Sequence, residues 1–152
     1  MKLLNESFIT AFLPGVAPYH PPMVHVIVGT AMVLPFLILA AIVLIDKYET
    51  SPRIWLLIAL LHVFLFAGAV GANVTGHVDE EIAEKAVAKE LIHDHEELGE
   101  VAMYLSGLAL FTALAGIKEM TFTRYIRYGS LGISAAVMIG VLYTGKLGGE
   151  LV

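Results

Sequence analysis

The sequence contains no cysteine and few charged residues. The absence of cysteine excludes disulfides, thiolate metal sites, iron–sulfur clusters and covalently attached c-type haem. Any bound metal must therefore be held by histidine, carboxylate or methionine. Charged residues make up 15% of the 152 residues and apolar residues 58%, whereas charged residues make up about 25% of ordinary soluble domains. This composition excludes both a disordered chain and an ordinary soluble domain.

Four long segments contain no Asp, Glu, Lys or Arg, namely Pro21 to Ile45, Ile54 to His77, Val101 to Ile117 and Tyr128 to Gly145. A helix needs about 20 apolar residues to cross a bilayer, and only helices satisfy their own backbone hydrogen bonds in lipid. The sequence therefore predicts one all-α domain, an integral membrane four-helix bundle. We expect spans at about 22–45, 54–76, 98–117 and 126–145, with an acidic connection at about 77–97 whose pattern is helical from Asp79 onward.

The basic residues of the short connections predict the orientation of the bundle. They gather in the first and third connections: Lys47, Arg53, Lys118, Arg124 and Arg127. The middle connection is instead strongly acidic. Because short cytoplasmic loops carry an excess of Lys and Arg, we expect a multi-pass protein of the cytoplasmic (inner) membrane with both termini on the outer side.

The chain repeats a histidine and glycine pair. HVIVG (His25 to Gly29) returns 70 residues later as HEELG (His95 to Gly99), the Thr-Gly pairs at Thr75 and Thr144 are 69 apart, and the basic connections are 71 apart. Similarity at a near-constant offset is typical of an internal repeat. It predicts two tandem helical hairpins related by a pseudo-two-fold axis along the membrane normal.

The repeat selects His25 and His95 as the axial ligands of one b-type haem near the outer leaflet. Two residues related by a two-fold axis approach it from opposite sides, as two axial imidazoles require, and bundle cores are a common place for cofactor ligands. Gly29 and Gly99 lie one turn deeper and leave room for the macrocycle. Three further residues are expected to contact the haem propionates or to serve as helix-end groups: His20, His77 and Lys146.

The remaining histidines leave alternatives open. His62 lies deep in the second span, where it could ligate a second haem or contribute to a quinone site, but a hydrogen bond to a neighbouring helix is expected. His93 stands beside Asp94, His95, Glu96 and Glu97, a group of plausible zinc or iron ligands. This group supports an alternative function, a divalent-metal binding or transport protein. Independently of it, His62, His77 and His93 are the alternatives to His25 and His95 as metal ligands.

Three motifs resemble a known membrane family. The opening HPPMVHVIVG, the later HEELG and the closing TGKLGGELV are similar to the family catalogued as domain of unknown function 2231. Its members show a His-Pro-x-x-Val-His opening, a later His-x-x-Leu-Gly and a closing Gly-Gly-x-Leu-Val. The resemblance implies a four-helix membrane domain associated with haem or redox proteins.

Composition, repeat and resemblance together predict a membrane cytochrome b or the electron-transfer subunit of a larger redox complex. Electrons would pass between quinol in the lipid and an extracytoplasmic partner such as a cytochrome, and no nucleic acid is involved. The sequence holds no complete catalytic constellation, so an enzyme acting by itself is not expected. A purely structural anchor subunit is the third alternative.

Overall fold

The described part of the chain is almost entirely helical. A computed structural model describes the backbone of residues 20–83 and 88–150 and the side chains of residues 24–76 and 88–148. Within these ranges the elements are α2 (His20–Tyr48), the short 3-10 helix η2 (Pro52–Ile54), α3 (Trp55–Ala83), α4 (Lys89–Ala115) and α5 (Thr123–Glu150). Four segments are long and apolar enough to cross a membrane: Val24–Tyr48, Pro52–Gly76, Lys89–Ala115 and Thr123–Gly148. The predicted all-α, four-helix membrane protein is confirmed.

The helices extend beyond the charge-free segments from which they were predicted. Each of α2 and α3 has 29 residues, a length of about 44 Å, whereas the hydrocarbon core is about 30 Å thick. Much of the acidic connection predicted at 77–97 is also helical, because α3 continues to Ala83 and α4 begins at Lys89. The helical pattern that begins at Asp79 is therefore divided between α3 and α4.

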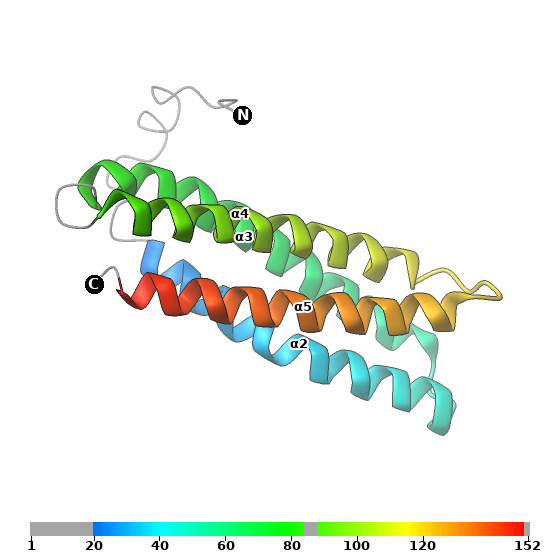
Figure 1. Cartoon of the computed structure of the whole chain (residues 1–152). Helices are drawn as coiled ribbons and strands as arrows, with labels where there is room; N and C mark the ends of the chain where they lie inside the picture. Colours follow the sequence, from blue (N-terminus) through cyan, green and yellow to red (C-terminus); the bar gives the residue numbers. More distant parts are fainter. Residues whose placement is uncertain (1–19, 84–87, 151–152) are drawn as a thin grey trace.

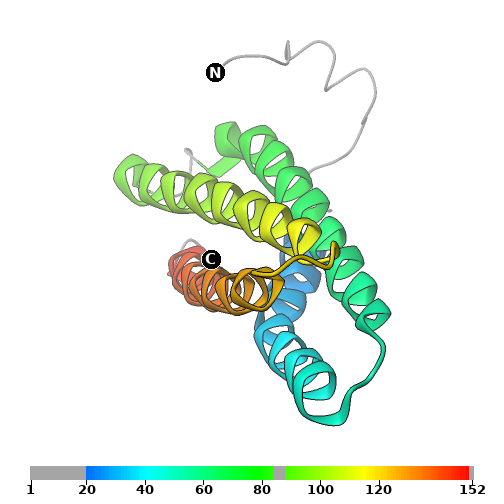
Figure 2. The same cartoon turned by 90° about the vertical axis from the view of Figure 1, so that its right-hand side faces the viewer.

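The four long helices alternate in direction and form a ring in which each packs against two neighbours. The most extensive contacts are those of α2 with α3, α3 with α4, α4 with α5, and α5 with α2. Figure 1 shows the two short connections at one end of the bundle, which we call the loop end, and Figure 2 views the bundle from there. The start of α2 and the end of α5 lie at the opposite, terminal end.

The surface and the interior differ as expected for a membrane bundle. Large apolar side chains face outward on every helix, among them Phe36, Leu60, Phe111 and Ile139. The interior instead includes small and polar side chains, since Ser106, Ser130 and Ser134 are buried beside Ala109 and Ala113. Helices in lipid associate through close packing and interhelical hydrogen bonds, and small residues allow both.

The loop end is held by one buried aromatic ring and one buried cation. Trp55 is fully buried and donates from Nε1 to the carbonyl of Ala113 at 2.8 Å. The guanidinium of Arg127 lies 5.2 Å from the centre of the indole ring and donates to the carbonyl of Gly116 at 3.1 Å and to Glu119 at 2.7 Å. A Cβ at Gly116 would lie 2.6 Å from the indole Nε1. Gly116 is therefore required for the indole to pack against the end of α4.

Candidate functional site

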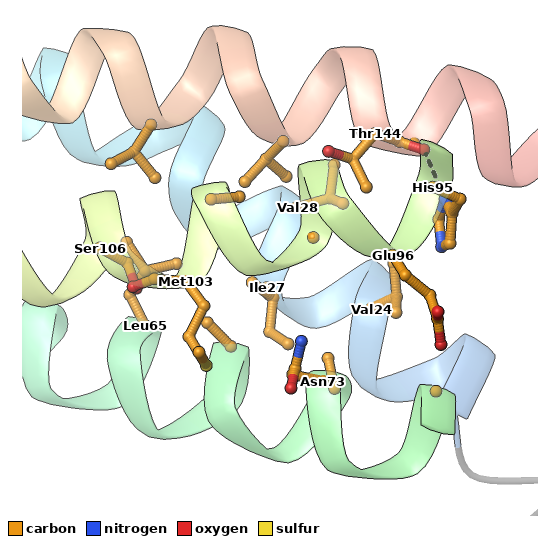
Figure 3. A pocket seen from close by; sticks show the side chains of 18 residues that line it. Val24, Ile27, Val28, Leu65, Asn73, His95, Glu96, Met103, Ser106 and Thr144 are labelled. Carbon is orange, nitrogen blue, oxygen red and sulfur yellow. Dashed lines mark hydrogen bonds between the residues drawn. The ribbon is translucent and has the colours of Figure 1, made fainter. Parts of the chain in front are cut away.

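A cavity lies between the four helices in the half of the bundle nearest the terminal end, and we call it the terminal cavity (Figure 3). Its volume is about 110 Å³. It exists because small residues face the interior where a larger side chain would fill the space: Ala69, Ala72, Gly99, Ala102 and Gly145. An added Cβ at Gly99 or Gly145 would meet no atom within 4 Å. The terminal cavity is thus a partly open space lined mainly by small and apolar side chains.

His95 of α4 lines the terminal cavity on the side nearest the terminal end of the bundle. Its Nδ1 is 3.2 Å from the carbonyl oxygen of Thr144 on α5, the contact drawn as a dashed line in Figure 3. A carbonyl oxygen can only accept, so Nδ1 carries the proton, and in the neutral ring Nε2 is an acceptor. The close approach of α5 behind the ring depends on Gly148, where a Cβ would lie 3.0 Å from Cε1 of His95. The structure therefore holds this imidazole in one place and one tautomer.

Four further polar residues line the terminal cavity, namely Asn73, Glu96, Ser106 and Thr144. Glu96 follows His95 on α4 and is partly buried, and Asn73 reaches the cavity from α3 (Figure 3). Most of the other lining residues are apolar, including Ile27, Leu65 and Val137. A few convergent polar groups in a mostly apolar pocket are typical of small-molecule sites.

Only one of the two predicted axial ligands lines the terminal cavity. Of the repeated pairs, His95 and Gly99 line the terminal cavity, whereas His25 and Gly29 lie on the exposed face of α2 and are not among the lining residues. Val24 and Val28 occupy the cavity side of α2 instead.

His25 and His95 lie on different faces of their helices because the spacing of the buried residues differs by one residue from the spacing of the repeated histidines. Ala31, Ile38 and Ile42 of α2 are buried, and so are Ala102, Ala109 and Ala113 of α4, each 71 residues further along. The repeated His and Gly are 70 residues apart. One residue turns the side chain by about 100° around a helix, which places His25 outside. The missed lining residues Val24 and Val28 could have been found from this apolar spacing, because they are the positions 71 residues before His95 and Gly99.

His62 is fully buried in α3 and does not line the terminal cavity. Its Nδ1 donates to the carbonyl of Ile58 at 2.8 Å, and its Nε2 is 2.9 Å from Oγ of Ser134 on α5. With Nδ1 protonated, Nε2 accepts from the serine hydroxyl in the neutral ring. The predicted hydrogen bond between His62 and a neighbouring helix is confirmed.

The other candidate residues contribute less to this site. His93 is exposed on α4, and Lys146 is exposed near the end of α5. The side chains of His20 and His77 lie outside the described residues. Within the described part of the chain, no three His, Asp or Glu side chains gather as a metal ion requires. The divalent-metal alternative therefore has no supporting cluster in this part of the protein.

Comparison with known proteins adds no relative: no family model matches the chain, and neither a curated protein nor a solved structure matches it. The resemblance to the domain of unknown function family stays a prediction from three short motifs.

Proposed function

We propose that the chain is a membrane electron-transfer subunit of a larger redox complex, working between quinol in the lipid and an extracytoplasmic carrier such as a cytochrome. One observation carries the proposal: an imidazole in a fixed tautomer, His95, lines an apolar cavity inside the bundle. Ionisable side chains that face the interior of a membrane bundle are costly and mark proton, ion or cofactor sites. The subunit positions the reacting molecule and accepts protons, and redox centres of its partners receive the electrons.

On this proposal the hairpins α2–α3 and α4–α5 are related by a pseudo-two-fold axis along the membrane normal. Residues of diagonal helices that are about one repeat length apart are expected to touch only near such an axis. Trp55 and Arg127 are 72 residues apart and in contact, with 5.2 Å between the ring centre and the guanidinium carbon. His62 and Ser134 are also 72 residues apart, and they share a hydrogen bond of 2.9 Å. These two contacts between α3 and α5 support the axis.

The proposed orientation places the terminal cavity in the outer half of the membrane. Basic residues of both short connections lie at the loop end, including Lys47, Arg53 and Lys118. The terminal end carries the exposed acidic side chains Glu90 and Asp94. By the excess of Lys and Arg in cytoplasmic loops, the loop end faces the cytoplasm of the inner membrane and both termini face outward.

A b-type haem between His25 and His95 stays a prediction, and the residues as they stand do not fit it. His95 has the features of an axial ligand, because a backbone carbonyl holds its Nδ1 and directs Nε2 as the donor to a metal. The second ligand is absent from the terminal cavity, since His25 faces outward. A volume of about 110 Å³ is also below the roughly 300–1,000 Å³ of pockets for large ligands. No step of the proposed function is therefore routed through a haem.

The proposal is tested in membranes from cells that lack the chain and are complemented with variants. The measured quantity is the rate at which added quinol reduces an extracytoplasmic cytochrome. We expect His95→Ala to lower the rate at least tenfold, while His93→Ala, an exposed histidine two residues away on the same helix, retains it. Normal electron transfer in His95→Ala membranes, with the complex assembled, would favour a structural anchor and refute the proposal.

The haem prediction has its own measurement, the pyridine haemochrome spectrum of the purified protein. A reduced α-band that disappears in both His25→Ala and His95→Ala would establish the axial pair and require α2 to turn on binding. A colourless preparation that still supports electron transfer would leave the proposed function intact and exclude the haem.

A further inference from the structure

We infer that the loop end of the bundle binds anionic phospholipids, such as phosphatidylglycerol, through the exposed side chains of Lys47, Arg53 and Lys118. These three cations contact the lipid phosphate, and apolar side chains beneath them contact an acyl chain. The lipid contact is independent of the proposed electron-transfer function. Two features of the loop end carry it: the pairing of its charges and the depth at which they lie in the membrane.

The loop end has an excess of positive charge. Its two connections and the helix ends beside them contain five basic and three acidic residues: Asp46, Lys47, Glu49, Arg53, Lys118, Glu119, Arg124 and Arg127. Of the charged side chains that are described and exposed toward the terminal end, most are acidic, among them Glu90, Asp94 and Glu97. Because opposite charges attract and like charges repel, an anionic headgroup is favoured at the loop end and disfavoured at the terminal end.

Two of the five basic side chains already have carboxylate partners in the bundle. Nε of Arg124 lies 3.0 Å from the carboxylate of Asp46, which joins α5 to α2. Arg127 donates to Glu119 at 2.7 Å and is buried against the rest of the loop end. These two guanidinium groups stabilise the fold, and we do not assign them to the lipid.

The other three basic side chains are exposed and available to a ligand. Among the described residues, Lys47, Arg53 and Lys118 form no ion pair. The one acidic side chain of the loop end that is not engaged by an arginine is Glu49, which is also exposed. The unpaired groups therefore have a net charge of two positive units. Hydrogen bonds between a charged donor and a phosphate oxygen are roughly twice as strong as neutral ones, so a lipid phosphate is a favourable partner.

Exposed tyrosines place these cations at the level of the lipid headgroups. Tyr125 and Tyr143 are both exposed on α5, and their spacing of 18 residues corresponds to about 27 Å along the helix. The hydrocarbon core is about 30 Å thick, and tyrosines are enriched at its two interfaces. Tyr125 therefore marks the interface at the loop end. Tyr48, the last residue of α2, is exposed at the same end, and Nζ of Lys47 lies 5.6 Å from the centre of its ring.

The surface beneath the cations favours a phospholipid over a soluble phosphate. Val43 precedes Lys47 by four residues, and Leu57 follows Arg53 by four, so each lies about one turn deeper in the membrane. Both apolar side chains are exposed. A single lipid can therefore place its phosphate beside a cation and an acyl chain against the apolar side chain beneath it, whereas a soluble phosphate makes only the first contact.

The test is native mass spectrometry of the full-length protein in detergent, titrated with phosphatidylglycerol or with the zwitterionic phosphatidylcholine. We expect the wild type to bind phosphatidylglycerol more tightly. Each basic residue near an anionic lipid surface contributes a factor of roughly five in affinity. Lys47→Gln, Arg53→Gln and Lys118→Gln should therefore each raise the Kd for phosphatidylglycerol about fivefold, and the triple variant roughly a hundredfold.

Two further variants separate the proposed contacts from a general effect of charge. Lys146→Gln removes an exposed cation near the terminal end and should leave the Kd unchanged. Glu49→Gln removes the unpaired carboxylate of the loop end and should lower the Kd for phosphatidylglycerol. Circular dichroism checks that each variant keeps its helicity. The single variants remain decisive if the triple variant does not fold.

Several results would overturn the inference. It fails if the wild type binds the two lipids equally well, if the three single variants bind phosphatidylglycerol as the wild type does, or if Lys146→Gln weakens binding as much as they do. Glycerophosphoglycerol, the same headgroup without acyl chains, is the probe for a soluble phosphate. Displacement of phosphatidylglycerol by an equal concentration of this compound would assign the loop end to a soluble ligand and refute the lipid.

Discussion

The hydrogen bond between His62 and Ser134 should contribute measurably to the stability of the bundle. It joins α3 to α5 at 2.9 Å between two buried side chains. In His62→Leu the carbonyl of Ile58 keeps its helical partner, the backbone N–H of residue 62, so the main loss is the bond to Ser134. Side-chain hydrogen bonds between helices in membranes average about 0.6 kcal/mol and reach about 1.7 kcal/mol. We expect a coupling free energy in this range, equal to a roughly 3-fold to 18-fold change in the unfolding constant.

A double-mutant cycle measures this coupling. The wild type, His62→Leu, Ser134→Ala and the double variant are unfolded reversibly in mixed micelles of increasing SDS content, and helicity is followed by circular dichroism. Ser130 provides an internal control one turn away, because its buried Oγ has no hydrogen-bond partner among the described residues. Ser130→Ala should therefore be neutral or stabilising, with no coupling to His62→Leu. A coupling energy between positions 62 and 134 that is zero within error would refute a structural role for the pair.

Three further predictions concern the loop end and the orientation. Gly116→Ala should destabilise the bundle by about 1–3 kcal/mol in the same unfolding assay, because a Cβ would lie 2.6 Å from the indole nitrogen packed on it; an unchanged stability would contradict that contact. Arg127→Ala should lower the free energy of unfolding by about 2 kcal/mol, since the Arg127 side chain is 7% exposed and makes two hydrogen bonds. Arg124→Ala should lower the stability much less than Arg127→Ala does, since the Arg124 side chain is 66% exposed; equal losses would refute the distinction. In this cysteine-free chain, Lys146→Cys should react with an impermeant maleimide in intact cells and Ser51→Cys only after lysis, whereas the reverse pattern would invert the proposed orientation.

The membrane fold could be predicted from the sequence because lipid leaves the chain few alternatives. A charge-free segment of about 20 residues must form a helix to satisfy its backbone, and each of the four such segments lies largely within one of the four long helices. The ends of the helices could not be predicted in the same way. Beyond the bilayer, water satisfies the backbone groups, and the absence of charge no longer marks where a helix ends. For that reason α3 continues to Ala83.

The site could be predicted in part. The repeat selected two pairs, and one of them, His95 and Gly99, lines the terminal cavity. The other pair, His25 and Gly29, matches it in residue type but lies on the exposed face of α2. Burial depends instead on helical phase, which apolar residues such as Ala31 and Ala102 define. The match in residue type was the more conspicuous signal, but the spacing of buried residues decides which face of α2 points inward.

The proposed two-fold axis gives this difference between the two pairs a general cause. Equivalent positions that lie at the axis face each other, so two identical large side chains there would compete for one space. The contacts between α3 and α5 instead pair different residues: Trp55 with Arg127, and His62 with Ser134. Equivalent positions away from the axis face different neighbours, or lipid, and can remain identical without any clash. In a duplicated bundle, identity between the halves is therefore most easily retained away from the axis. Complementary pairs at constant spacing, a large residue opposite a small or polar one, are the better guide to the residues that meet there.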